Sequence, residues 1–343
     1  MDHELARREF LKKAAHAAAV ASASAGIASA SVPRGKALTL ADTIPARVFG
    51  KTGVKLPILG YGGAALPKVW GNPLSFEGRV KLVRYAYKRG LRYFDTGGNY
   101  MESQPILGEA LKPVRDKVWL VSKVSTTVPG RVRKAVERCL RELKTDYLDL
   151  VQIHGTPGLE QMSVARAMNV HAELVKLRDE RLVRFLGFTA HSYFDKALAL
   201  IQSGGFDQCM LAYGYLPRGH NQVLSPRSIR LREQCLAKAH EQKMGIVAMK
   251  VIGAGMLGAW AGHIVPRFDK RRLKHLPAAA IRYVLHDKRI HMLCIGMRLR
   301  SDIDANIKTL AGDVTCTEAD RALLAEFGPQ ALKSDAMRKM KVE

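Results

Sequence analysis

Cysteine is scarce in this chain, and its few cysteines stand at no spacing typical of a disulfide framework or a metal site. The five cysteines are Cys139, Cys209, Cys235, Cys294 and Cys316. Their odd number, with no Cys-x-x-Cys pair, argues against a disulfide framework, an iron–sulfur site and a zinc knuckle. The histidines offer no metal spacing either, because His240-Glu241 lacks a second histidine four residues later. We therefore expect no bound metal ion.

Long apolar runs are also missing. The alanine-rich run 14–30 is too short and too weakly apolar to span a bilayer stably. It follows Arg7-Arg8 and ends in Ala28-Ser29-Ala30, which resembles a twin-arginine export signal. We therefore predict a signal peptide over residues 1–30, the twin-arginine export machinery as a partner, and a periplasmic or exported protein that crosses the membrane folded. The alternative is an amphipathic N-terminal helix that contains Arg-Arg by chance.

Acidic residues are few relative to basic ones. The chain has 31 Asp and Glu against 55 Lys and Arg, a formal net charge of +24. Two of its basic clusters lie at 227–232 and 270–274, and aromatic residues are not interleaved with them. Without such interleaving or a nucleic-acid-binding motif, we expect no nucleic-acid partner. The basic surface is then either a solvated face or a weak contact for an anionic envelope surface.

No proline- or serine-rich linker and no internal repeat divides the body of the chain. A first barrel strand is predicted to close at 60–63, and further strand-like runs are predicted at 91–95, 117–123, 147–153, 183–189, 206–212, 245–251 and 290–295. Helices are predicted near 77–89, 103–112, 130–144, 163–180, 192–203, 226–242, 273–287 and 301–310, and from Thr317. Eight parallel strands with helical crossovers predict a single-domain α/β fold, a (β/α)8 TIM barrel.

The barrel is bounded by shorter segments. A leader is expected over 31–45, the barrel over 46–328 and a basic C-terminal tail over 329–343. Within the barrel segment, apolar residues flank Lys51-Thr52-Gly53, and this pattern predicts a hairpin at the barrel floor ahead of the first barrel strand.

Four polar residues stand where three predicted strands end: Asp95, Tyr100, Lys123 and His154. The carboxyl ends of parallel strands share one rim, so these side chains are expected to converge. An ammonium ~4 Å from a phenol contributes at most ~4 kcal/mol at an effective dielectric of 20, enough to lower the phenol pKa by up to ~3 units. We therefore expect Lys123, held by Asp95, to lower the pKa of Tyr100. The alternative is a structural Asp95–Lys123 ion pair beside a tyrosine that anchors a loop.

Three stretches carry a resemblance to a known family. They are Asp95–Leu111, with its Asp-Thr-x-x-x-Tyr pattern, Val121–Val124, and Asp146–His154. In this order, over roughly residues 47–309, the chain resembles the aldo-keto reductase family. The resemblance implies an enzyme that interconverts an aldehyde or ketone and an alcohol by hydride transfer with a nicotinamide. It implies that Tyr100 donates the proton and that His154 binds the carbonyl oxygen.

The resemblance also implies a cofactor, NADPH preferred and NADH possible. The residues expected to contact it are Gly62, Gly63, Thr189, His191, Lys250, Gly253, Gly255, Arg298, Arg300 and Asn306. The run 253–258 has G-x-G-x-x-G spacing, but it lies late in the chain and no acidic residue ends a second strand ~20 residues on, so we reject a Rossmann interpretation. We expect this loop and Lys250 to approach the cofactor pyrophosphate. The alternative is a flexible barrel loop without a ligand.

The last predicted strand leads into a segment that resembles the family's adenosine-phosphate site. Arg298 and Arg300 would hold a 2′-phosphate beside a helix N-terminus, and Asn306 would face the adenine. Ser301 and Asp302 are interpreted as helix caps. The carboxylate of Asp302 opposes phosphate binding by repulsion or by neutralising an arginine.

The chain departs from the family pattern at several cofactor positions. Thr189 keeps a hydroxyl where serine is usual, but Ala190 replaces an asparagine for which His191 is a possible substitute. Three further positions differ: Met210, Met249 and Ala305. These changes keep a rival function open, a cofactor-binding regulatory module with little turnover. We predict an exported, monomer-capable reductase acting on a small carbonyl compound.

Overall fold

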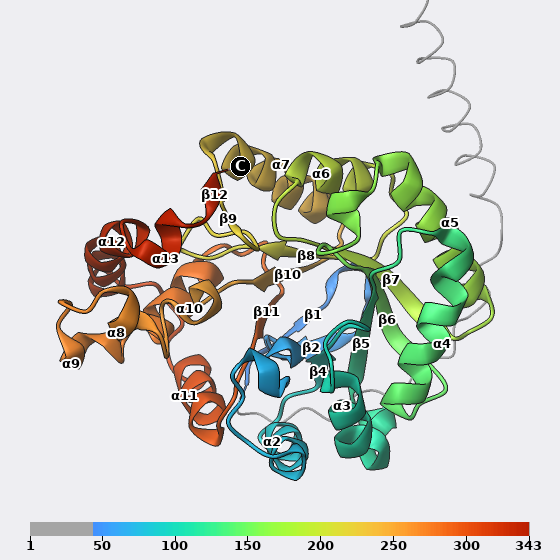
Figure 1. Cartoon of the computed structure of the whole chain (residues 1–343), viewed down its shortest axis with the longest axis horizontal. Coiled ribbons are helices and arrows are strands. Elements are labelled where there is room, and N and C mark those ends of the chain that lie inside the picture. Colours follow the sequence, from blue (N-terminus) through green and yellow to red (C-terminus); the bar gives the residue numbers. More distant parts are fainter. Residues whose placement is uncertain (1–43, 343) are drawn as a thin grey trace, which may run out of the picture. The chain divides into compact units, whose positions relative to one another are not determined.

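The computed structural model describes residues 44–342. The predicted signal peptide and nearly all of the predicted leader lie outside this range. The described chain forms a ring of strands surrounded by helices (Figure 1). This arrangement confirms the predicted (β/α)8 barrel.

Eight parallel strands close the barrel in the order β10-β11-β3-β4-β5-β6-β7-β8. Their bounds are β3 Leu59–Gly62, β4 Tyr93–Asp95, β5 Trp119–Val124, β6 Leu148–Ile153, β7 Val183–Ala190, β8 Gln208–Ala212, β10 Gly245–Met249 and β11 Met292–Ile295. Asp95 pairs with Gly62 on one side and Val121 on the other, and Lys123 pairs with Gln152. This register brings the ends of β4, β5 and β6 to one rim.

The surrounding helices are α2 Phe76–Lys88, α3 Ser103–Leu111, α4 Val132–Leu143, α5 Val164–Asp179, α6 Phe194–Gln202, α7 Pro226–Glu241, α10 Leu276–His286 and α11 Arg300–Ala311. Serine hydroxyls cap the first turns of three of them, at Ser75, Ser163 and Ser225. Each helix buries one apolar stripe against the strands. In α4 this stripe consists of Val132, Val136, Cys139, Leu140 and Leu143.

The predicted hairpin closes one end of the barrel. Its strands, β1 Ala46–Val48 and β2 Lys55–Pro57, pair antiparallel. Phe49 packs edge-on against Tyr93 and Trp119, with both pairs of ring centroids 6.1 Å apart. Gly50 has a φ of +54°, and a Cβ there would strike the backbone at Gly245. The opposite rim therefore remains available for a site.

A second apolar cluster lies beside the main core, around Leu257, Leu324 and Phe327. It joins α10 to α8 Ala261–Ile264, α12 Glu318–Leu332 and α13 Asp335–Arg338, which gather with α9 Lys270–Leu273 on one side in Figure 1. Thr317 caps α12, as the sequence predicts. The final strand β12 Lys341–Val342 pairs with β9 Gln222–Val223. Within residues 44–342, no helix combines the length and apolar character needed to cross a membrane.

Candidate active site

A buried ion pair joins the ends of β4 and β5. Lys123 Nζ lies 2.5 Å from Asp95 Oδ2 and donates to the Thr96 carbonyl at 2.6 Å. Both side chains are nearly inaccessible to solvent. Burial lowers the pKa of Lys123, but its ion pair and hydrogen bond with Asp95 hold this pKa above its ordinary value. The ammonium therefore stays charged.

A chain of amide hydrogen bonds supports Asp95 inside the barrel. Gln152 Nε2 donates to Asp95 Oδ1 at 3.0 Å, and Gln208 Nε2 donates to Gln152 Oε1 at 2.9 Å. The Tyr93 hydroxyl completes the chain by donating to Gln208 Oε1 at 3.1 Å. All four residues are buried. Sequence reasoning missed Gln208 and Tyr93; the available signal was a glutamine at the start of the buried run 208–212, which is otherwise apolar.

Tyr100 stands directly above this pair. Lys123 Nζ is 4.6 Å from the centre of its ring, and its hydroxyl lies 3.4 Å from His154 Nε2. Burial raises the pKa of Tyr100 by more than Lys123 lowers it, so the net pKa is above its ordinary value. The expected lowering of the pKa of Tyr100 is therefore wrong, because partial burial of the phenol outweighs the effect of the ammonium. Tyr100 holds its proton at neutral pH.

His154 follows β6 and completes the group. Its Nδ1 lies 3.0 Å from the Ser125 hydroxyl, a contact that sequence reasoning missed. Burial, helped by the charge of Lys123, lowers the pKa of His154 well below its ordinary value. A neutral imidazole has one donor and one acceptor nitrogen, so one nitrogen serves Ser125 and the other faces the Tyr100 hydroxyl.

Several predicted cofactor residues lie at neighbouring strand ends. Thr189 Oγ1 accepts a hydrogen bond from Gly155 N at 2.7 Å, which leaves its own proton free to donate. His191 Nδ1 is buried and has no protein partner. Burial lowers the pKa of Lys250 to about 8, and the nearby Arg218 contributes. No acidic group pairs with Lys250 in the part of the chain that the structure describes.

The predicted glycine positions divide into two kinds. Gly253 and Gly255 form the short turn after β10, with φ of +57° and +95°. A Cβ at Gly63 would strike the Asp95 carbonyl and the Ser103 hydroxyl, and one at Gly62 would come within 3.0 Å of Gly296 N. Gly62 and Gly63 are thus required by packing beneath the site, whereas Gly253 and Gly255 are required by the positive φ angles of their turn.

The segment after β11 is partly occupied by its own contacts. Arg298 Nη2 donates to the Trp70 carbonyl at 2.7 Å, and its guanidinium lies 5.5 Å from the centre of the Trp260 ring. Arg298 Nε remains buried without a partner. Arg300 lies over the Tyr85 ring at 4.9 Å, and Asn306 is buried on α11.

The two predicted caps of α11 behave differently. Asp302 Oδ2 accepts from Arg298 N at 2.8 Å and Leu299 N at 2.9 Å, as a cap does. Ser301 instead lies within the first helical turn. Asp302 therefore takes backbone donors that a phosphate at this helix end would use. Within residues 44–342, no group of three His, Cys, Asp or Glu side chains could hold a metal ion.

The site places an ammonium, a phenol and an imidazole together on the barrel rim. Comparison of the sequence with models of protein families gives a result consistent with this site. A model described as the Aldo/keto reductase family matches residues 58–324. The chain belongs to the aldo/keto reductase family. Reduction of carbonyl compounds with NAD(P)H is the activity that this membership supports.

Known relatives agree with this placement. The chain is 25% identical over 293 residues to L-galactose dehydrogenase of Arabidopsis thaliana, which covers 77% of this chain and 87% of that protein. The holo form of aldo-keto reductase AKR11C1 from Bacillus halodurans superposes with a TM-score of 0.66 at 17% identity, covering 86% of this chain and 99% of that one. An aldo/keto reductase from Klebsiella pneumoniae, in complex with NADP and acetate, gives 0.62 at 18% identity, covering 86% and 99%.

Proposed function

We propose that this aldo/keto reductase reduces an aldehyde or ketone with NADPH, or runs the reverse oxidation, at the Tyr100 hydroxyl. The observation that carries the proposal is the buried Asp95–Lys123 pair beneath a tyrosine whose hydroxyl faces His154. A carbonyl oxygen placed between that hydroxyl and the imidazole has a proton donor on one side and a neutral polar ring on the other. The bound cofactor supplies the hydride.

Each residue has a separate task in this scheme. Tyr100 donates its proton to the carbonyl oxygen as negative charge develops there. Lys123 stabilises the phenolate that remains, because its ammonium is fixed 4.6 Å from the ring centre. His154 binds and orients the oxygen, and Ser125 fixes the angle of its ring.

Turnover distinguishes this proposal from the regulatory module. The purified protein is incubated with NADPH and a panel of small aldehydes and ketones, and NADPH oxidation is followed. We expect turnover, since all four groups of the site are in contact. Tight retention of cofactor without turnover on any carbonyl would favour the regulatory module instead.

Three nitrogen-bearing side chains near the rim lack a full set of partners among the described residues, and their donors and positive charges suit the phosphates and amide of a dinucleotide. Within residues 44–342, Lys250 has no acidic partner and His191 Nδ1 and Arg298 Nε have no hydrogen-bond partner, so a bound dinucleotide would satisfy them. We infer that Lys250 and the Gly253 turn hold the pyrophosphate and that Arg298 and Arg300 hold a 2′-phosphate, which makes NADPH the preferred cofactor. The similar aldo/keto reductase from Klebsiella pneumoniae binds NADP in its crystal structure, which is consistent with this choice.

Cofactor affinity is expected to fall as pH rises above 8. The pKa of Lys250 is lowered to about 8, so its ammonium is charged below that pH and attracts the pyrophosphate. Above it, binding requires uptake of a proton, and affinity should fall by up to ~tenfold per pH unit. Fluorescence titration of NADPH between pH 7 and 9.5 measures this dependence. A Lys250→Met variant should bind more weakly and lose the dependence; an identical pH profile in that variant would contradict the role of Lys250.

The 2′-phosphate contacts predict the cofactor preference. Charge-assisted hydrogen bonds of ~1.5–3 kcal/mol correspond to a roughly tenfold to hundredfold preference for NADPH over NADH. An Arg298→Ala/Arg300→Ala variant should lose most of this preference, as measured by titrating both reduced cofactors. Equal affinity for the two cofactors in the wild type, or an unchanged ratio in the variant, would refute the assignment.

We also propose that the protein is exported by the twin-arginine route to the periplasm. The support is Arg7-Arg8 ahead of the alanine-rich run. Replacing both arginines by lysine is expected to leave a folded, uncleaved precursor in the cytoplasm, as judged by fractionation and immunoblotting. Mature protein outside the inner membrane in that variant would show that another route operates.

A further inference from the structure

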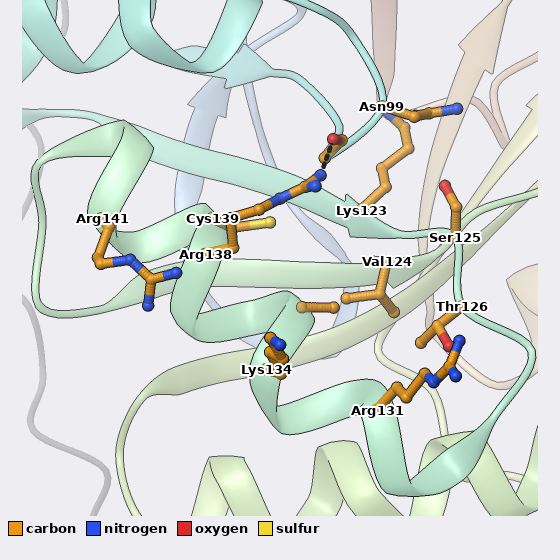
Figure 2. A pocket seen from close by; sticks show the side chains of 12 residues that line it. Asn99, Lys123, Val124, Ser125, Thr126, Arg131, Lys134, Arg138, Cys139 and Arg141 are labelled. Atoms are coloured by element: carbon orange, nitrogen blue, oxygen red, sulfur yellow. Dashed lines mark hydrogen bonds between the residues drawn. The ribbon is translucent and has the colours of Figure 1, made fainter.

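An open cavity of about 600 Å³ lies outside the ion pair, against α4. Figure 2 shows one wall formed by α4 and the residue before it, with Arg131 just ahead of the helix and Lys134, Arg138 and Arg141 on it. The opposite side carries Asn99 and Ser125, from the segments that follow β4 and β5. Lys123 also borders the cavity, but its ammonium is already bonded to Asp95 and Thr96.

The four cations form a row that begins at Arg131, the residue before α4, and continues along one face of that helix. Their spacing of three, four and three residues places them one above another on the helix, over a length of ~15 Å. No acidic residue lines the cavity. Arg131, Lys134 and Arg141 have no ion pair among the described residues; Arg138 lies 3.6 Å from Glu142 and donates to the Gly98 carbonyl.

The row of cations does not stabilise α4, so helix stability does not explain why these residues are there. Like charges three or four residues apart destabilise a helix by ~0.2–0.5 kcal/mol per pair. The first turn of α4 has no acidic residue, although the helix dipole favours one there. Arg133, one residue away from Lys134 and off the cavity, is paired with Glu137 and Glu180. The unpaired cations are therefore confined to the face that lines the cavity.

We propose that this cavity binds a small polyanion with at least two phosphate or carboxylate groups. Its volume falls in the range of small-molecule sites, ~300–1,000 Å³. A single anionic group reaches only part of a ~15 Å row, so several are needed to engage it. The site is a cavity and not a flat surface, so it fits a compact ligand better than it fits a lipid surface.

The test measures binding of inorganic pyrophosphate by calorimetry, with excess NADP present to fill the cofactor cleft. We expect Arg131→Gln/Lys134→Gln to weaken binding at least tenfold. The matched control is Arg227→Gln/Arg230→Gln, which removes the same charge from exposed positions on α7 that have no ion pair in the described chain. The control should change affinity less than twofold. Arg131 and Lys134 are both exposed, and circular dichroism verifies that the variant folds.

Four outcomes would overturn the proposal. Equal weakening in the two variants would mean that only net charge matters, and unchanged binding in both would place pyrophosphate elsewhere. Loss of binding in Lys250→Met alone would place it in the cofactor cleft. Binding to anionic phosphatidylglycerol vesicles that depends on Arg131 and Lys134, without pyrophosphate binding, would make the row a membrane contact. The readout is independent of turnover, so it stands apart from the proposed function.

Discussion

Replacing Tyr100 by phenylalanine is expected to lower kcat for carbonyl reduction by at least ~10²-fold, the contribution typical of a positioned general acid. The hydroxyl is the group beside His154 that holds its proton at neutral pH, since burial raises the pKa of Tyr100. Cofactor affinity should be nearly unchanged, because the removed oxygen faces the carbonyl. Steady-state kinetics with NADPH and the best carbonyl substrate, together with NADPH titration, measure both quantities.

The pH profile gives a second test of the same residue. At saturating NADPH, wild-type kcat for reduction should stay level from pH 7 to 9 and fall only at higher pH, where Tyr100 loses its proton. His154 adds no inflection near neutrality, because its pKa is lowered well below the ordinary value. Tyr283→Phe, the same chemical change on α10, should be indistinguishable from wild type. Undiminished turnover in Tyr100→Phe would remove this hydroxyl from the mechanism.

Replacing Lys123 by methionine is expected to abolish measurable reduction and to destabilise the fold by ~3–5 kcal/mol, the usual cost of leaving a buried charge without its partner. Asp95 would lose its 2.5 Å contact while remaining buried. Burial raises the pKa of Asp95 even in the wild type, and loss of the ammonium raises it further. Below that pKa the carboxyl is neutral, so the stability difference from wild type should be smaller at pH 5 than at pH 8. Urea unfolding at both pH values measures it.

The double variant Asp95→Asn/Lys123→Met separates stability from catalysis. It removes both charges while an amide oxygen can still accept from Gln152, so most of the lost stability should return. Reduction should remain lost, because no ammonium lies under the Tyr100 ring. A single Lys123→Met variant as stable as wild type at pH 8 would show that Asp95 was never an uncompensated charge.

Much of this fold could be predicted because its local signals agree with its tertiary structure. The apolar stripe of α4 and the serine caps at Ser75, Ser163 and Ser225 are sequence patterns, and each corresponds to an observed helix. The two-residue strand β12 could not be predicted, because its conformation depends on pairing with β9, more than a hundred residues earlier.

The sequence predicted which residues form the site, but it did not predict the pKa of Tyr100. Strand ends bring Asp95, Tyr100, Lys123 and His154 together, which a parallel barrel requires. The pKa of Tyr100 depends on how much water reaches the phenol, and no sequence spacing encodes that exposure. Arg298 likewise has partners, at Trp70 and Trp260, that come from distant loops and cannot be deduced from neighbouring residues.

The amide chain beneath Asp95 limits how the active site recovers its proton. Hydrogen bonds run in one direction, from Tyr93 through Gln208 and Gln152 to Asp95. The two glutamine amides donate without titrating near neutral pH, so this chain orients the carboxylate but cannot relay protons across the barrel. If Tyr100 is the proton donor, as proposed, it must be reprotonated from the solvent side, past His154 and the partly exposed Ser125. In the proposed mechanism, proton return to Tyr100 and entry of the carbonyl compound therefore take place from the same side of the barrel.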